Sequence, residues 1–199
     1  MSDPIRILGF SGSTRAHSHN RVLVEIATSA AARAGADVQL LDLRDFHLPL
    51  YDADLEAESG LPKSAIALKA LFVAADGFLV ASPEYNGSLT AVLKNAIDWL
   101  SRPGPAPGET EVTLRAIRGK VAGIMSASPG GWGGVRGLAH LRQILSGMGT
   151  LVVAEQLAVP SAASAFDASG TLQNPVHRAV VESIGTRVVQ FARAMRSET

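Results

Sequence analysis

Hydroxyl, amide and guanidinium side chains are concentrated in one short stretch near the N-terminus. This stretch, SGSTRAHSHN, follows the apolar run IRILGF and precedes a segment with helical spacing. The first turn of a helix has unpaired backbone N–H groups and the positive end of a dipole worth roughly half an elementary charge, so the position favours an anion. For Ser18 or Asn20 alone, a simple N-cap is the alternative. As a cluster, the residues predict a phosphate site made by Ser11, Ser13, Arg15, Ser18 and Asn20.

The kind of phosphate follows from what this stretch lacks. A dinucleotide site requires glycines spaced G-x-G-x-x-G, and only Gly12 lies between Gly9 and Asn20. A nucleoside triphosphate site requires G-x-x-x-x-G-K-[ST], and no lysine precedes residue 63. Hydroxyl donors with one arginine suit a terminal monophosphate dianion instead. FMN ends in such a group.

A second stretch, SPEYNG, follows another apolar run. Pro83 fixes one backbone angle, while Asn86 and Gly87 readily adopt left-handed conformations. The peptide can therefore present N–H and C=O groups to a flat heterocycle, and Tyr85 can cover a ring. Taken alone the same residues make an ordinary turn, but beside a phosphate loop they predict a seat for the isoalloxazine ring.

A third stretch, SASPGGWGGVRG, follows the next apolar run. Ser126 and Ser128 can reach the pyrimidine or ribityl side of such a ligand. Gly130, Gly131, Gly133 and Gly134 allow a close approach of the backbone to a ligand or to another subunit. Trp132 is expected to be exposed, where it could equally make an oligomer contact.

The elements that position these loops alternate between short apolar runs and segments of 3.6-residue periodicity. This pattern is typical of βαβ units, and it predicts one doubly wound α/β domain over residues 1–199 with strands apolar on both faces. Ligands bind such sheets outside the carboxyl ends of the strands. The segments 102–110 and 160–175 are predicted to be plain surface excursions. Strands are predicted at 5–10, 38–42, 77–81, 121–126 and 151–157, and helices at 21–34, 64–74, 90–100, 137–148 and 176–195.

Composition excludes several classes of function. Eighteen basic and eighteen acidic residues leave no net charge to attract nucleic acid or an anionic membrane. The absence of cysteine excludes thiolate catalysis and cysteine-bound metals. No signal or membrane-spanning segment is evident, so a cytoplasmic protein is expected. The stretch GFSGS lacks the last glycine of a hydrolase nucleophile elbow, and His17 and His19 are read as loop residues rather than metal ligands.

Together these stretches resemble the NADPH-dependent FMN reductases of the flavodoxin-like superfamily, especially the chromate and quinone reductase branch. The resemblance implies a three-layer flavodoxin-like fold, with a five-stranded parallel sheet in the order 2-1-3-4-5, and homodimers or homotetramers with FMN near a subunit boundary. The matching segments are GSTRAHSHN, PLYDAD, SPEYN, LKNAIDWLSR and GGVRGLAHLRQIL.

Carried over residue by residue, the resemblance assigns the phosphate to the first stretch and the flavin ring to the other two. Ala127 stands where many relatives have a second hydroxyl residue, so the resemblance implies no hydroxyl contact at this position. The implied ring contacts are Pro83, Glu84, Tyr85, Asn86, Gly87 and Ser126 or a close neighbour such as Ser128.

The resemblance also implies an activity. Hydride would pass by a ping-pong route from NADPH or NADH to FMN, and two electrons then to a quinone, chromate, azo compound or similar small molecule. The cofactor carries the reactivity, so no catalytic acid, base or nucleophile is expected. An FMN-binding electron carrier or regulatory module is the alternative, although carriers are usually strongly acidic. The sequence does not separate NADH from NADPH, and Arg136 is a candidate partner for a 2′-phosphate.

Overall fold

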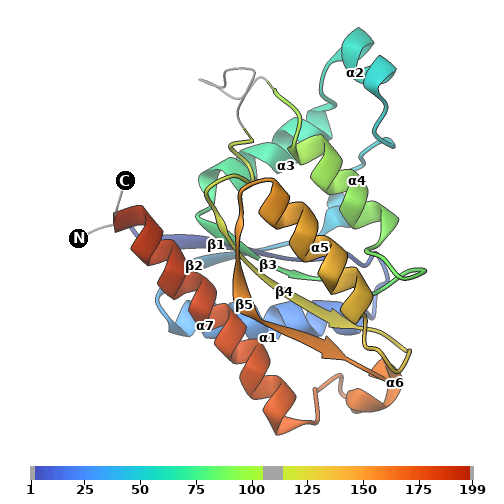
Figure 1. Ribbon diagram of the computed structural model, residues 1–199, viewed down its shortest axis with the longest axis vertical. Coiled ribbons are helices and arrows are strands. Elements are labelled where there is room, and N and C mark those ends of the chain that lie inside the picture. The colour runs from blue at the N-terminus through green and yellow to red at the C-terminus, as the bar shows by residue number, and fades with distance from the viewer. Residues whose placement is uncertain (1–2, 105–113, 198–199) are drawn as a thin grey trace.

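The computed structural model describes residues 3–104 and 114–197 as a central sheet with helices on both faces (Figure 1). All strand pairs are parallel, and the strand order is β2-β1-β3-β4-β5. The predicted flavodoxin-like α/β fold is therefore confirmed. The strands are β1 (Ile5–Ser11), β2 (Ala36–Leu41), β3 (Gly77–Ala81), β4 (Val121–Ala127) and β5 (Leu151–Val159).

Two helical layers cover the sheet. One core cluster joins α1 and α7 to one face, and a second joins α3, α4 and α5 to the other (Figure 1). Among the described helices, none has the length and hydropathy needed to cross a bilayer. The helices are α1 (His19–Arg33), α2 (Ala53–Ser59), α3 (Lys63–Ala74), α4 (Ala91–Leu100), α5 (Val135–Gly147), α6 (Ala162–Ala165) and α7 (Pro175–Ser197), with a 3-10 turn η1 (Leu43–Asp45).

Burial along the strands follows their place in the sheet. Every residue of β3 and β4 is buried, because both faces of these strands are covered by helices. The strand β2 lies at the edge, and none of its residues is fully buried. The other edge strand, β5, is also only partly buried. The prediction that all five strands are covered on both faces is thus wrong for β2 and β5, because the helical layers cover the edges of the sheet less completely than its centre.

The segment between β5 and α7 also differs from its prediction. Ala162, Phe166 and Leu172 are buried in the same core cluster as α1 and α7. The segment is therefore part of the core rather than a plain surface excursion, and its short helix α6 was not predicted. Of the other predicted excursion, residues 105–110 lie outside the described part of the chain.

Three loops leave the sheet side by side, at the carboxyl ends of its strands. Ser11 pairs with Ala81, and Ala81 pairs with Met125, so β1, β3 and β4 end side by side. We call the loops that leave these ends the first-strand loop (residues 12–18), the third-strand loop (residues 82–87) and the fourth-strand loop (residues 128–134).

Candidate flavin site

The first-strand loop leaves the sheet where the strand order reverses, between β1 and β3. Ser11 and Ser13 are buried, and the Ser13 N–H donates to Ser11 Oγ at 3.1 Å. The Gly12 N–H donates to the Ala81 carbonyl at 2.8 Å, and the Gly12 carbonyl accepts from Thr90 Oγ1 at 2.6 Å. These bonds hold the loop against β3 and the start of α4.

The N-terminus of α1 opens onto the same loop. Ser18 occupies the N-cap position with extended backbone angles, but its side chain makes no capping hydrogen bond. Ser18 as a whole is nonetheless buried. The simple-cap alternative is therefore wrong for Ser18, whose hydroxyl stays available beside the N–H groups that begin the helix.

The side-chain amide of Asn20, which was predicted to contact the phosphate, is hydrogen bonded to the backbone of Ala127. Its Nδ2 donates to the Ala127 carbonyl at 2.8 Å, and its Oδ1 accepts from the Ala127 N–H at 2.8 Å. Asn20 is buried, so both bonds are shielded from water. The side chain joins the first turn of α1 to the end of β4, which holds the first-strand and fourth-strand loops at a fixed separation.

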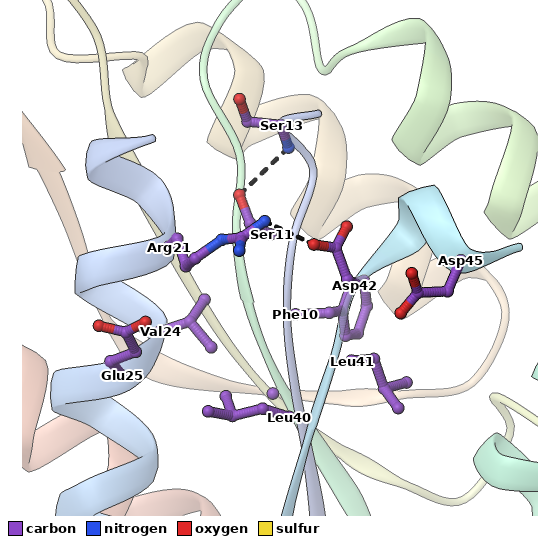
Figure 2. Close-up of a pocket in the computed structure, with 11 residues that line it drawn as sticks. Phe10, Ser11, Ser13, Arg21, Val24, Glu25, Leu40, Leu41, Asp42 and Asp45 are labelled. Carbon is purple, nitrogen blue, oxygen red and sulfur yellow. Dashed lines mark hydrogen bonds and ion pairs between the residues drawn. The ribbon is translucent and has the colours of Figure 1, made fainter. Parts of the chain in front are cut away.

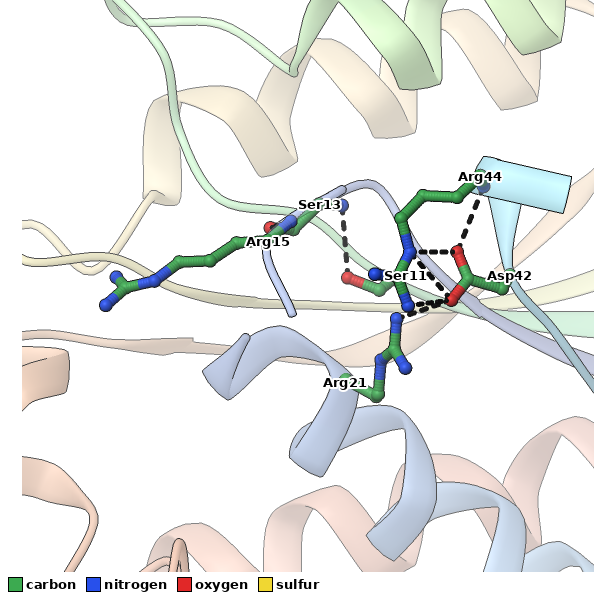
Figure 3. A network of polar contacts seen from close by, with 6 residues as sticks. All are labelled: Ser11, Ser13, Arg15, Arg21, Asp42 and Arg44. Carbon is green, nitrogen blue, oxygen red and sulfur yellow. Dashed lines mark hydrogen bonds and ion pairs between the residues drawn. The ribbon is translucent and has the colours of Figure 1, made fainter. Parts of the chain in front are cut away.

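The arginines near this loop fall into two groups (Figure 3). Arg21 and Arg44 both bind Asp42 at the end of β2, each with an Nη2 to Oδ2 distance of 2.6 Å. Hydrogen bonds from Arg44 and then Arg21 hold the pKa of Asp42 below its ordinary value despite its partial burial. Arg15 is exposed, projects away from this cluster, and forms no ion pair with any described residue.

A pocket of about 200 Å³ lies between α1 and the end of β2, behind the first-strand loop (Figure 2). Ser11 and Ser13 line it together with apolar side chains of β1 and β2. Its charged lining is mixed, because Arg21 lines it together with Glu25, Asp42 and Asp45, and the guanidinium of Arg21 points toward Asp42. No local pattern predicts the Arg21–Asp42–Arg44 cluster, because Arg21 on α1 is 21 residues from Asp42, which caps the turn η1 that contains Arg44.

The two histidines of this region lie in different surroundings. His17 is exposed, whereas the His19 ring stacks on Phe166 with centroids 4.5 Å apart and an interplanar angle of 17°. Burial, and secondarily Arg15, lower the pKa of His19 below 6.5. The stack connects the start of α1 to the segment that follows β5.

The third-strand loop is a tight turn. The N–H groups of Tyr85 and Ser88 each donate to the other's carbonyl, at 2.9 and 3.0 Å. Asn86 and Gly87 at its tip have φ angles of +51° and +82°. The predicted left-handed conformations at these two positions are confirmed, and the Tyr85 side chain is exposed.

Unlike the side chain of Tyr85, the side chain of Glu84 is largely buried. Its carboxylate accepts hydrogen bonds from Arg136 Nε at 2.8 Å and from the Arg136 and Gly137 N–H groups at 3.1 and 3.3 Å. Burial alone would raise the pKa of Glu84, but the bonds from Arg136 and Gly137 lower it below its ordinary value. Arg136, a candidate for a 2′-phosphate, is therefore already paired.

Beside the fourth-strand loop, the end of β4 contains a buried polar atom that makes no hydrogen bond among the described residues. Ser126 is 0% exposed, and its Oγ makes no hydrogen bond among the described residues. Gly134 faces it with φ +95°, and a Cβ at position 134 would lie 1.9 Å from Ser126 Oγ. The Ser128 N–H is bonded to the Val159 carbonyl at 3.2 Å, and Trp132 is 71% exposed, as expected.

A groove of about 870 Å³ begins beside the third-strand loop and runs between α4 and α5. Tyr85 and Asn86 line its near end, and Lys94, His140 and Ile144 line its sides. His140 Nδ1 is hydrogen bonded to Ser88 Oγ at 2.9 Å. The groove gives a small molecule access to the third-strand loop.

These features fit FMN. An open helix N-terminus with an exposed guanidinium suits a terminal phosphate. The left-handed turn, the close approach at Gly134 and the unbonded Ser126 hydroxyl suit a flat polar ring. Among the described residues, no cluster of three or more histidine, cysteine or acidic side chains could hold a metal ion.

Comparisons with known proteins agree with this fit. The family model for NADPH-dependent FMN reductase matches residues 5–164. An NAD(P)H-dependent FMN reductase of Pseudomonas aeruginosa is 37% identical over 197 residues, covering 98% of this chain and 100% of that protein. A quinone reductase of Escherichia coli K12 is 36% identical over 153 residues, with coverages of 77% and 76%. The solved flavoenzyme NAD(P)H:(acceptor) oxidoreductase of Paracoccus denitrificans has a TM-score of 0.77 and 26% identity, with coverages of 96% and 98%.

Proposed function

The chain belongs to the NADPH-dependent FMN reductase family, and on that premise we propose a ping-pong transfer of two electrons from NAD(P)H to quinones, chromate, azo compounds or similar acceptors. That the protein is an NAD(P)H-dependent oxidoreductase using FMN follows from the family itself. The order of the two half-reactions, the acceptors and the residues of the site are the proposal. When bound, FMN supplies the hydride chemistry.

The phosphate end of the site is proposed at the start of α1. Arg15 provides an exposed guanidinium, Ser18 a hydroxyl not used for capping, and the first N–H groups of the helix point the same way. Ser11 and Ser13 shape the loop through their own hydrogen bonds. Asn20 contributes by position, because both polar ends of its amide are bonded to Ala127.

The ring end is proposed between the third-strand and fourth-strand loops. The backbone N–H groups of Glu84, Asn86 and Gly87 would stabilise negative charge on the reduced ring, and Ser126 and Ser128 would complete its polar edge. Tyr85 is exposed at the mouth of the 870 Å³ groove, through which nicotinamide and acceptor reach the same face in turn. No side chain is proposed as acid, base or nucleophile.

A homodimer or homotetramer is also proposed. Trp132 in the fourth-strand loop is 71% exposed, and the groove between α4 and α5 has apolar as well as polar lining. An exposed tryptophan next to a site is a typical interface residue. A second copy of the chain covering this face would exclude water from the ring.

The open N-terminus of α1 beside Arg15, which forms no ion pair with any described residue, is the observation that carries the proposal. It is tested by titrating the Arg15→Ala apoprotein with FMN and with riboflavin, which lacks the phosphate. Loss of hydrogen bonds to a charged group, about 1.5–3 kcal/mol, is expected to raise the dissociation constant of FMN about 10- to 100-fold. Riboflavin affinity is expected to stay unchanged, as is FMN affinity in the control His17→Ala.

Unaltered FMN affinity in Arg15→Ala would remove the phosphate assignment. The reductase activity is tested by mixing the FMN-loaded protein anaerobically with NADPH. Rapid loss of the yellow colour is expected. Reduction that requires a separate partner protein would replace the reductase by an electron carrier.

A further inference from the structure

The helix α5 begins without a cap of its own. Its N-cap residue is Gly134, which has a left-handed backbone conformation. Because glycine has no side chain, Gly134 makes no side-chain capping hydrogen bond. The first N–H groups of a helix need an acceptor when water is excluded. Here the acceptor comes from a distant part of the chain, because the Glu84 carboxylate binds the Arg136 and Gly137 N–H groups across 52 and 53 residues.

The same carboxylate also pairs with a side chain. Its other oxygen, Oε1, accepts from Nε and Nη2 of Arg136. The side chain of Glu84 is 6% exposed, whereas that of Arg136 is 62% exposed. Bonds to a buried carboxylate are worth more than those of a surface ion pair, because an unpaired charge there would be poorly solvated.

The contact joins the two loops proposed to hold the flavin ring. Glu84 lies between Pro83 and Tyr85 in the third-strand loop, and a Cβ built on Gly134 would meet Glu84 Cβ at 3.6 Å. The other side of Gly134 faces the unpartnered hydroxyl of Ser126. Moving Glu84 would therefore move the backbone of residues 83–87 relative to Gly134 and Ser126.

We propose that Glu84 is a positioning residue, which fixes the third-strand loop against the start of α5 and so sets how tightly the reduced flavin ring is held. This inference rests on the proposed function. It assigns the side chain of Glu84 to the fold of the site and leaves the ring contacts at this position to the backbone.

Three variants separate position from charge: Glu84→Gln, Arg136→Met and the double variant. Arg136 is exposed, so Arg136→Met is expected to fold even if Glu84→Gln does not. In the double variant the net charge is unchanged while the pairing is gone. The measurements are the dissociation constants of FMN and riboflavin, the two-electron midpoint potential of the bound flavin, and the unfolding temperature of the apoprotein.

Loss of positioning is expected to raise the dissociation constants of FMN and riboflavin alike, about tenfold, in the double variant. The anionic reduced ring loses more than the oxidised ring, and a further tenfold difference between them lowers the midpoint potential by about 30 mV. The matched control is Glu155→Gln with Arg187→Met, which removes a 3.2 Å ion pair between β5 and α7. It is expected to leave both flavin readouts unchanged.

Two results would overturn the inference. A midpoint potential that rises in Glu84→Gln and returns to the wild-type value in the double variant would show a direct charge effect. A lower unfolding temperature with unchanged affinities and potential would show that Glu84 only caps α5. If the wild-type protein bound no FMN, the proposed function itself would fail, and this inference with it.

Discussion

The first-strand loop leaves its arginine exposed and without an ion pair to any described residue, whereas the charged side chain of the third-strand loop is buried against a helix 52 positions further along the chain. The phosphate end of the proposed site thus keeps Arg15 and Ser18 available for a ligand. At the ring end, Glu84 and Arg136 are paired with each other, so this end presents mainly backbone groups to a ligand. In the proposed site, side chains would bind the charged phosphate, and backbone groups held in a fixed conformation would bind the flat ring.

This difference has a consequence for mutation. At the phosphate end a substitution removes one contact, and the effect should depend on whether the ligand has a phosphate. At the ring end a substitution displaces a loop, and the effect should appear with FMN and riboflavin alike.

The largest effect is expected from Gly134→Ala. The new methyl group would lie 1.9 Å from Ser126 Oγ on a residue with φ +95°. Left-handed strain and overpacking together are expected to lower the free energy of unfolding by about 2–5 kcal/mol. Affinity for FMN and riboflavin should fall together, as measured by titration and by urea unfolding.

Gly130→Ala is the matched control in the same loop. A Cβ at Gly130 meets nothing within 4 Å, and Gly130 is not among the glycines with positive φ. Stability is expected to be unchanged or to rise by about 0.4–1 kcal/mol. If Gly130→Ala weakened flavin binding as much as Gly134→Ala, close approach at Gly134 would not be what shapes the loop.

The next largest effect is expected from Asn20→Ala, which tests the link between the two ends. Both amide bonds to Ala127 are lost, and each of the two buried backbone groups left behind costs about 1–2 kcal/mol, in the lower part of the range for an unsatisfied buried group. The free energy of unfolding should fall by about 2–4 kcal/mol, with FMN affinity lower as well. The measurements are urea unfolding and FMN titration.

Asn95→Ala supplies the comparison for Asn20. The amide of Asn95 also makes two hydrogen bonds to backbone groups. Its Oδ1 accepts from the Tyr51 N–H at 2.8 Å, and its Nδ2 donates to the Pro49 carbonyl at 2.9 Å. It lies outside the three loops and is less buried, so a smaller loss of stability with unchanged FMN affinity is expected. Equal losses of FMN affinity in both variants would show that Asn20 has no special part in the site.

The sequence predicted the sheet and the position of every long helix to within two residues. Local signals decide these features, because periodicity and glycine stops act within one element: Gly35, for example, ends α1 with φ +85°. The left-handed conformation of Asn86 was also predicted from its residue type and its place in the loop. The roles of Asn20 and Glu84 were not, because each depends on a partner more than 50 residues away.

The smallest effect is expected from His19, which couples the phosphate end to the segment after β5. Because burial and Arg15 lower its pKa below 6.5, the folded protein binds fewer protons than the unfolded chain just below that pH. The free energy of unfolding should therefore fall as the pH drops from about 6.5 through the folded pKa. Phe166→Leu removes the stacked ring and Arg15→Ala removes the nearby cation, so each should raise the His19 pKa towards 6.5 in an NMR titration. An unchanged pKa in both variants would mean that neither the Phe166 ring nor the Arg15 cation sets the surroundings of His19, and the proposed coupling between the phosphate end and the segment after β5 would be wrong.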